Sequence, residues 1–217
     1  MKFRLERVSV EYAGIPAVRN LSIDYDGTDV LILMGATGAG KTTLLRLLYA
    51  DVLPSQGDVM INGVSTSTMS LKVRQQMRRK MGIVQQDGRL MSDYTVFENV
   101  LATYALSGYS RRHAEEACLS LLADLNISYV RQKYPRELSG GERHLVALAR
   151  ALAVNPEVVI ADEPTGTLDP ATTLEVARIF QRVVDQGIGV VVSTHNPAFA
   201  AAFPTARTIT LAEGALQ

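Results

Sequence analysis

One short stretch combines glycine, lysine and threonine at a spacing that suits phosphate binding. It reads Gly35-Ala36-Thr37-Gly38-Ala39-Gly40-Lys41-Thr42-Thr43. Glycines let the backbone curl so that its N–H groups face inward, and a helix beginning near Lys41 would add its positive N-terminal end. In the phosphate-binding loop pattern, Lys41 contacts the β- and γ-phosphates and the Thr42 hydroxyl is a ligand of Mg²⁺. The stretch therefore predicts a nucleoside triphosphate site.

The flanks of this loop favour phosphate binding over a plain glycine-rich turn. The apolar run 30–34 precedes the loop, and the mostly apolar run 44–48 follows it. The pattern requires a strand, then the loop, then a helix, and the flanks supply both neighbours.

Two carboxylates follow a second apolar run. Residues 158–161 are continuously apolar, as in a parallel strand buried on both faces, and Asp162 and Glu163 come directly after them. Asp162 would hold Mg²⁺ through a water, and Glu163 would orient or deprotonate the attacking water. The alternative is that the two acids simply cap the end of a strand. The phosphate loop in the same chain favours the catalytic interpretation over this alternative.

A histidine stands at the end of a third apolar run. Residues 189–193 predict a buried strand, with Thr194 and His195 at its tip. Because open parallel sheets bind ligands beyond the carboxyl ends of their strands, we expect the glycine loop, the acid pair and His195 to lie together.

Composition and charge limit the classes to which this protein can belong. The 217 residues suffice for one large α/β domain, and Lys plus Arg equals Asp plus Glu at 22, so no nucleic-acid partner is expected. The single Cys118 excludes an internal disulfide and a cysteine zinc site, and it suits a reducing compartment. Residues 1–7 lack the apolar core of a signal peptide, and no apolar run approaches the ~20 residues that span a bilayer. A membrane-spanning part is expected from another chain.

The first third of the chain predicts a small antiparallel layer. Residues 8–12 and 21–25 alternate in the manner of strands, and residues 59–61 predict another strand that ends in an Asn62-Gly63 turn. This layer would feed a parallel core.

The middle third predicts helices. Residues 71–81 are polar and basic and predict a surface helix, whose default role is a solvated face and whose alternative is a phosphate or membrane-surface contact. Apolar residues at helical spacing fill 93–126, with a break and an N-cap candidate at 107–110. Ser139 and Glu142 then form the Ser-x-x-Glu pattern of a capping box, which would start a helix by itself.

Together, these motifs and their order resemble an ABC-type ATPase, the nucleotide-binding subunit of an ATP-binding-cassette system. Residues 138–142, Leu-Ser-Gly-Gly-Glu, look like the ABC signature, and the resemblance covers nearly the whole chain. Residues 138–142 and 161–166 look most like the group of FtsE, LolD and MacB, while residues 81–87 and 93–100 lean towards FtsE, the cell-division ATPase. The resemblance implies an α/β P-loop NTPase of ABC ATPase type, with a mainly parallel core sheet, an N-terminal antiparallel β layer and an inserted α-helical subdomain.

The resemblance assigns roles to three further side chains. Gln86 matches the Q-loop glutamine, which contacts Mg²⁺ and water and senses the membrane partner. Gln85 beside it leaves the choice between two glutamines open, and a solvated turn glutamine is the plain alternative. His195 resembles the switch histidine that reaches the γ-phosphate, and its alternative is a histidine satisfied by backbone groups. Tyr12 matches the aromatic that stacks on adenine, although a lone strand tyrosine more often packs.

The signature implies that the site is shared between two chains. A capped helix start with Ser139, Gly140, Gly141 and Glu142 presents exposed N–H groups to an anion. By resemblance this anion is the γ-phosphate held by the loop of a second copy. Residues 167–169 resemble the D-loop that crosses the dimer interface, and Asp169 is also an N-cap candidate for a helix over 170–186.

Three positions depart from the family pattern. Arg143-His144-Leu145 stands where relatives usually carry Gln-rich residues and an Arg, Thr167 stands where this group often has Asn, and Gln85 stands where relatives often have an aromatic. The phosphate-binding groups remain intact, so we expect hydrolysis.

The resemblance implies a cytoplasmic ATPase subunit, peripheral on the inner face of the cell membrane. It would dimerise head to tail around two MgATP and move an integral membrane subunit, FtsX-like or a transporter permease. We expect one domain, with residues 1–86 and 151–217 forming the nucleotide-binding core and β layer, and 87–150 the helical subdomain that carries the signature. The alternatives are the ATPase of a lipoprotein-release or MacB-like efflux transporter, and a non-hydrolysing scaffold that binds ATP.

Overall fold

Two sheets organise the fold in the computed structural model, which describes residues 1–166 and 168–217. The N-terminal sheet is antiparallel and has the order β2 (Ile15–Tyr25), β1 (Phe3–Tyr12), β4 (Gln56–Ile61) and β5 (Val64–Ser65). Asn62 and Gly63 both have positive φ, 50° and 79°, as a tight two-residue hairpin turn requires. The predicted antiparallel layer is confirmed, with longer strands than the alternation indicated.

The second sheet is mainly parallel and places the chemistry-bearing residues at one edge. Its order is β10 (Ala215–Leu216), β9 (Arg207–Ala212), β3 (Val30–Met34), β8 (Gly189–Thr194), β7 (Val158–Asp162) and β6 (Met81–Val84). From β9 to β6 each neighbouring pair is parallel, and β10 pairs antiparallel with β9. Met34 pairs with Thr194, and Asp162 pairs with Ser193, so the ends of β3, β8 and β7 lie level.

Each strand of the core sheet divides its side chains between two hydrophobic cores. In β3, Val30 and Ile32 belong to one core, and Leu31 and Leu33 belong to the other. The same period of two operates in β7 and β8, because successive side chains of a strand point to opposite faces. The continuous apolar runs in the sequence therefore reflect strands that are buried on both faces.

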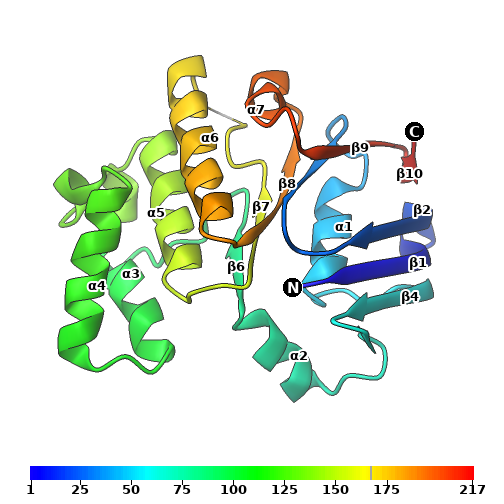
Figure 1. The fold of residues 1–217 in the computed structure, drawn as a ribbon, viewed down its shortest axis with the longest axis horizontal. Coiled ribbons are helices and arrows are strands. Elements are labelled where there is room, and N and C mark those ends of the chain that lie inside the picture. Colours follow the sequence, from blue (N-terminus) through cyan, green and yellow to red (C-terminus); the bar gives the residue numbers. More distant parts are fainter. Residues whose placement is uncertain (167) are drawn as a thin grey trace.

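Helices cover both faces of this sheet (Figure 1). α1 (Lys41–Leu48) lies between the parallel sheet and the antiparallel sheet, and its leucines join the core with β1 and β2. On the opposite side, α5 (Gly140–Leu152) and α6 (Pro170–Asp185) cover the sheet, while α3 (Val96–Leu106) packs against α5 and α4 (Arg111–Asp124) packs against α3. The short elements are α2 (Leu71–Arg78), α7 (Pro197–Ala201), η1 (Ser128–Val130) and η2 (Pro135–Glu137).

The helical middle third is present, with two local differences from the prediction. α2 ends at Arg78, before residue 81, because Met81 already belongs to β6. Ser110 occupies the N-cap position of α4, yet its hydroxyl bonds the His113 ring at 3.0 Å and caps no backbone N–H. The α/β fold class with its antiparallel layer is confirmed. The domain boundaries stay a prediction, and α5 crosses the predicted one at 150–151.

Candidate functional site

The glycine loop joins β3 to α1 and folds around the Lys41 side chain. Gly40 at the N-cap of α1 has φ 99°, and a Cβ there would lie 2.3 Å from the Ala17 carbonyl oxygen, so glycine is required. Lys41 is only 6% exposed. Its Nζ donates to the carbonyl oxygens of Gly35 at 2.8 Å and Ala36 at 3.1 Å. The loop therefore holds the ammonium group within its own curl.

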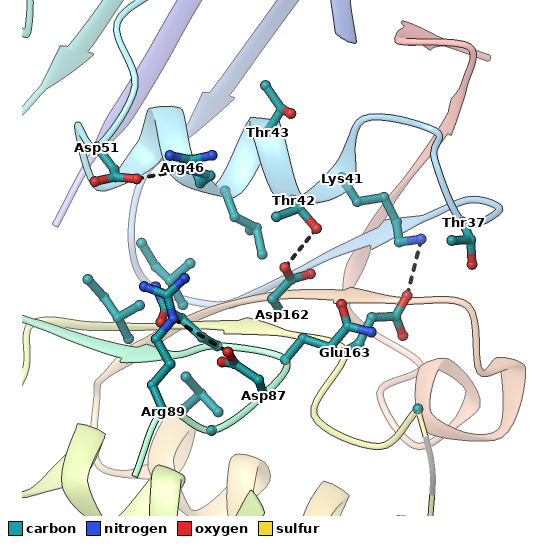
Figure 2. A pocket seen from close by; sticks show the side chains of 18 of the residues that line it. Thr37, Lys41, Thr42, Thr43, Arg46, Asp51, Asp87, Arg89, Asp162 and Glu163 are labelled. Atoms are coloured by element: carbon teal, nitrogen blue, oxygen red, sulfur yellow. Dashed lines mark hydrogen bonds and ion pairs between the residues drawn. The ribbon is translucent and has the colours of Figure 1, made fainter. Parts of the chain in front are cut away.

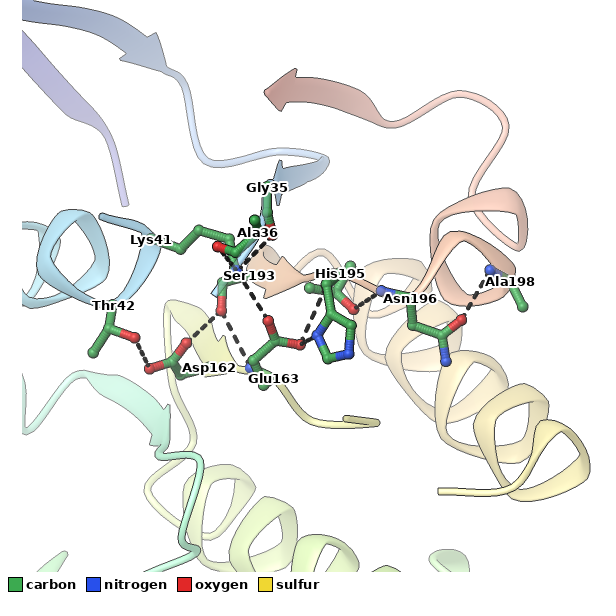
Figure 3. A network of polar contacts seen from close by, with 11 residues as sticks. Gly35, Ala36, Lys41, Thr42, Asp162, Glu163, Ser193, His195, Asn196 and Ala198 are labelled. Atoms are coloured by element: carbon green, nitrogen blue, oxygen red, sulfur yellow. Dashed lines mark hydrogen bonds and ion pairs between the residues drawn. The ribbon is translucent and has the colours of Figure 1, made fainter. Parts of the chain in front are cut away.

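The two acids at the end of β7 face different partners. Asp162 accepts hydrogen bonds from Thr42 Oγ1, at 2.7 Å, and from Ser193 Oγ. Glu163 Oε1 lies 3.1 Å from Lys41 Nζ, and both side chains are more than nine-tenths buried. Figure 3 shows that these contacts form one connected network across the ends of three elements.

His195 completes the network from the tip of β8. Its Nδ1 lies 2.9 Å from Glu163 Oε2, and its backbone N–H donates to the same oxygen at 3.3 Å. A carboxylate only accepts, so the ring proton sits on Nδ1. Both oxygens of Glu163 thus have cationic or N–H partners, one from α1 and one from β8.

The Glu163 backbone adopts an unfavourable conformation. Its φ is 49°, in the left-handed region that non-glycine residues seldom occupy and that costs of order 1–3 kcal/mol. Its N–H donates to the Ser193 carbonyl at 3.0 Å, which holds the turn in place. Such strain persists where the surroundings fix it, and it often marks a functional position.

A cleft of about 1020 Å³ opens along this network (Figure 2). One wall consists of the glycine loop and α1, and the acids at the sheet edge line its base. Tyr12, Gln85 and Gln86 also line the cleft, as do Thr37, Gly38 and Thr43 of the loop. Gln85 is half-buried against Tyr49, whereas Gln86 is exposed. The structure thus places the residues predicted to contact adenine and phosphate around one cavity, together with both glutamines. The roles of these residues stay predictions.

The donor atoms at the foot of α1 suit Mg²⁺ bound together with a nucleotide. In residues 1–166 and 168–217, no cluster of three or more His, Cys, Asp or Glu side chains forms a self-sufficient metal site. Thr42 Oγ1 and Asp162 Oδ2 instead offer two adjacent oxygens beside the phosphate loop. Mg²⁺ is commonly held by one or two carboxylates, waters and substrate phosphates, so this partial set fits.

The predicted capping box is present at the start of α5. The Ser139 hydroxyl accepts from Glu142 N at 3.2 Å, and Glu142 Oε2 accepts from Ser139 N at 2.7 Å. Ser139 and Gly140 are exposed. Gly140 also lines the cleft, together with Arg143 and His144, two residues that depart from the family pattern. The helix start is therefore accessible to an anion, as the signature resemblance requires.

Arg143 and His144, which depart from the family pattern, donate hydrogen bonds to backbone carbonyls around this helix start. His144 Nδ1 donates to the Gly140 carbonyl at 2.8 Å, and Arg143 Nε donates to the Pro135 carbonyl at 3.0 Å. Gly141 packs closely, since a Cβ there would lie 3.3 Å from Thr172. These contacts brace the capped turn without occupying its N–H groups.

Charge on Glu142 should stabilise the fold in a pH-dependent way. The Ser139 backbone N–H holds the pKa of Glu142 below its ordinary value. Because the folded pKa is depressed, the stabilisation is present above the unfolded pKa of about 4.3 and is lost as pH falls through the folded value. Glu142→Gln should lower the free energy of unfolding by about 0.5 kcal/mol at neutral pH. Urea unfolding at a series of pH values checks this, and a difference that persists unchanged in acid would contradict it.

Asp169 occupies the predicted N-cap of α6. Its Oδ1 accepts from the backbone N–H groups of Ala171 at 2.9 Å and Thr172 at 3.1 Å. The Thr172 hydroxyl adds a third bond and keeps the pKa of Asp169 below its ordinary value. Thr167, a predicted departure and part of the predicted D-loop, lies outside the described residues. Whether Asp169 contacts a second chain stays a prediction.

Sequence reasoning missed Ser193 as a member of the site. The sequence predicts Ser193 only as the last residue of a buried strand, yet its hydroxyl contacts Asp162 and the Glu163 backbone. The available signal was a hydroxyl ending a run of three valines. A buried polar group needs a partner, and the neighbouring strand ends in acids.

Known proteins share both the sequence pattern and the fold. The chain matches the family described as ABC transporter over residues 18–166. It is 36% identical over 183 residues to the cell division ATP-binding protein FtsE of Bacillus subtilis (strain 168), covering 84% of this chain and 80% of that protein. It is also 36% identical over 216 residues to the lipoprotein-releasing system ATP-binding protein LolD 2 of Caulobacter vibrioides, covering 98% and 94%. A solved dimeric, post-hydrolysis ATP-binding cassette bound to ADP and Pi superposes with TM-score 0.91 and 28% identity, covering 99% of this chain and 96% of that one.

Proposed function

Because this chain belongs to the ABC transporter family and is an ATPase subunit of that family, we propose that it acts as an FtsE-like, head-to-tail dimer around two MgATP. In this role it drives a membrane partner in cell division. The observation that carries ATP hydrolysis is the convergence of Lys41, Asp162, Glu163 and His195 on one cleft at the sheet edge. The similarity to FtsE supports the cell-division role.

Each side chain has a definite task in the proposed reaction. Lys41 contacts the β- and γ-phosphates and gives up its contact with Glu163 to do so. Glu163 then orients the attacking water and accepts its proton, while His195 reaches the γ-phosphate. Thr42 and Asp162 would hold Mg²⁺, with Gln86 as a further contact. When bound, Mg²⁺ neutralises charge on the phosphate oxygens.

The proposed dimer follows from the accessible start of α5. Ser139 and the N–H groups of Gly140 and Gly141 would contact the γ-phosphate that is bound in the loop of the partner copy. Glu142 would keep that helix start capped. Asp169 would lie at the same interface. The solved ATP-binding cassette described above is itself a dimer, which supports this arrangement.

The membrane partner would be FtsX-like, docked near Gln86 and the helical subdomain. Within the described parts of the chain, none of the helices has the length and apolarity to cross a bilayer. We infer a cytoplasmic subunit held peripherally at the inner face of the membrane by that partner.

Lipoprotein release is the second candidate role. The match to LolD 2 extends over 98% of this chain, further than the match to FtsE, at the same identity. The chemistry of the site is common to both roles, so the identity of the membrane partner separates them.

Affinity purification of the tagged chain from detergent-solubilised membranes tests the partner. Recovery of an FtsX-like protein, together with incomplete division when the gene is deleted, supports the cell-division role. Recovery of a transporter permease, with normal division and lipoproteins retained in the inner membrane, favours lipoprotein release. Phosphate release measured on the complex tests turnover, and its absence would instead support an ATP-bound scaffold.

A further inference from the structure

Ser193 is a hydroxyl placed deep in an apolar strand. It follows Val190, Val191 and Val192 in β8, and it is 0% exposed. Burying a hydroxyl without a partner is costly, so buried serines are hydrogen-bonded. In register, Ser193 stands opposite Asp162 of β7, which brings its hydroxyl to the acid pair.

The direction of each hydrogen bond follows from the protons available. A serine hydroxyl has one proton to donate and lone pairs to accept. An ionised carboxylate only accepts, so Ser193 Oγ donates to Asp162 Oδ1. The same oxygen accepts from the Glu163 backbone N–H at 3.2 Å. One side chain therefore ties the Asp162 carboxylate to the backbone of Glu163.

Asp162 is held through both of its carboxylate oxygens. Thr42 Oγ1 donates to Oδ2 from α1, and Ser193 Oγ donates to Oδ1 from β8, as Figure 3 shows. Donors on opposite oxygens fix the rotation of the carboxylate plane. When Thr42 offers its oxygen to a metal ion, Ser193 is the donor that keeps Oδ2 turned towards Thr42.

We propose that Ser193 is a positioning residue that orients the Asp162 carboxylate towards the Mg²⁺ of MgATP. The inference rests on the magnesium site proposed above. Ser193 touches neither metal nor nucleotide in this scheme and acts through Asp162.

Replacing the hydroxyl isolates this role because Glu163 keeps a partner. The Glu163 N–H also donates to the Ser193 backbone carbonyl at 3.0 Å, and Ser193→Ala leaves that carbonyl in place. The substitution therefore removes the donor to Asp162 Oδ1 and spares the turn that carries Glu163.

The experiment compares magnesium dependence in binding and in turnover for the purified full chain. A fluorescent ATP analogue is titrated at varied Mg²⁺ and in EDTA, and ATP hydrolysis is followed against Mg²⁺ concentration. Ser193→Ala should raise the half-saturating Mg²⁺ concentration about ten- to 100-fold in both assays, as expected when the hydrogen-bond partner of a metal-ligating carboxylate is lost. Binding in EDTA should not change, and kcat at saturating Mg²⁺ should stay close to that of wild type, because Ser193 touches none of the reacting atoms.

Two further variants separate positioning from a general loss of structure. Ser193→Thr keeps the hydroxyl and should retain the wild-type magnesium dependence. Thr66→Val removes a buried hydroxyl that has no hydrogen-bond partner in the described part of the chain, and it should also leave that dependence unchanged.

Two results would overturn the inference. One is wild-type magnesium dependence in Ser193→Ala, and the other is a fall in kcat alone. If wild type itself binds the analogue equally in Mg²⁺ and EDTA, the proposed magnesium site fails, and this inference fails with it.

Discussion

Glu163→Gln should lower kcat for ATP hydrolysis by at least about 100-fold, since a positioned general base contributes roughly that much or more. Glutamine keeps the size of the side chain but cannot take the proton of the attacking water. It also loses the ion pair with Lys41, whose Nζ lies 3.1 Å from Glu163 Oε1. Nucleotide binding should survive or tighten, because Lys41 no longer has to leave a carboxylate to reach the phosphates.

Phosphate release and size-exclusion chromatography with MgATP measure the two consequences. We expect the variant to accumulate as an ATP-bound dimer while turnover stops. Glu157→Gln is the matched control, because Glu157 is exposed and pairs only with Lys80 at 3.2 Å among its described contacts. Near-normal turnover in Glu163→Gln would show that Glu163 is not the general base. The dimer mechanism would be wrong if the chain eluted as a monomer under all nucleotide conditions and Lys41→Ala behaved like wild type.

The sequence was sufficient to predict the elements that carry this chemistry. Runs of apolar residues ending in acids or histidine gave the parallel strands, since burial on both faces leaves little choice of residue type. Capping patterns at Ser139 and Asp169 predicted the starts of α5 and α6, and both side chains make the expected backbone contacts. These signals are local, so they can be read from neighbouring residues alone.

What the sequence could not predict depends on contacts between distant segments. Ser193 meets Asp162 because β8 and β7 pair in one particular register, and a shift by one residue would turn the hydroxyl to the other face. The positive φ of Glu163 has no sequence signal, since glutamate gives no preference for that conformation. The contact between Lys41 and Glu163 joins residues on either side of the helical region. Such features come from tertiary packing, which is also where the reaction is arranged.

Lys41→Met should weaken ATP binding by at least about 100-fold, because a phosphate loses a charge-assisted contact of roughly 3 kcal/mol. In the present structure Nζ has three acceptors, namely two loop carbonyls and Glu163 Oε1, which match its three protons. The substitution therefore also strips the buried Glu163 carboxylate of its cationic partner. We expect the free energy of unfolding to fall by about 3 kcal/mol, as for other broken buried pairs.

A double-mutant cycle in urea tests whether the Lys41 effect comes from an unpaired charge. Adding Glu163→Gln to Lys41→Met neutralises the stranded carboxylate, so the double variant should regain most of the lost stability while still failing to bind ATP. Lys80→Met, which breaks an exposed pair with Glu157, should cost less than about 1 kcal/mol. Additive losses at Lys41 and Glu163 would show that their contact contributes nothing to stability. Recovery would show that the pair is a folding contact that ATP binding must replace, which links the stability of the empty site to its affinity for nucleotide.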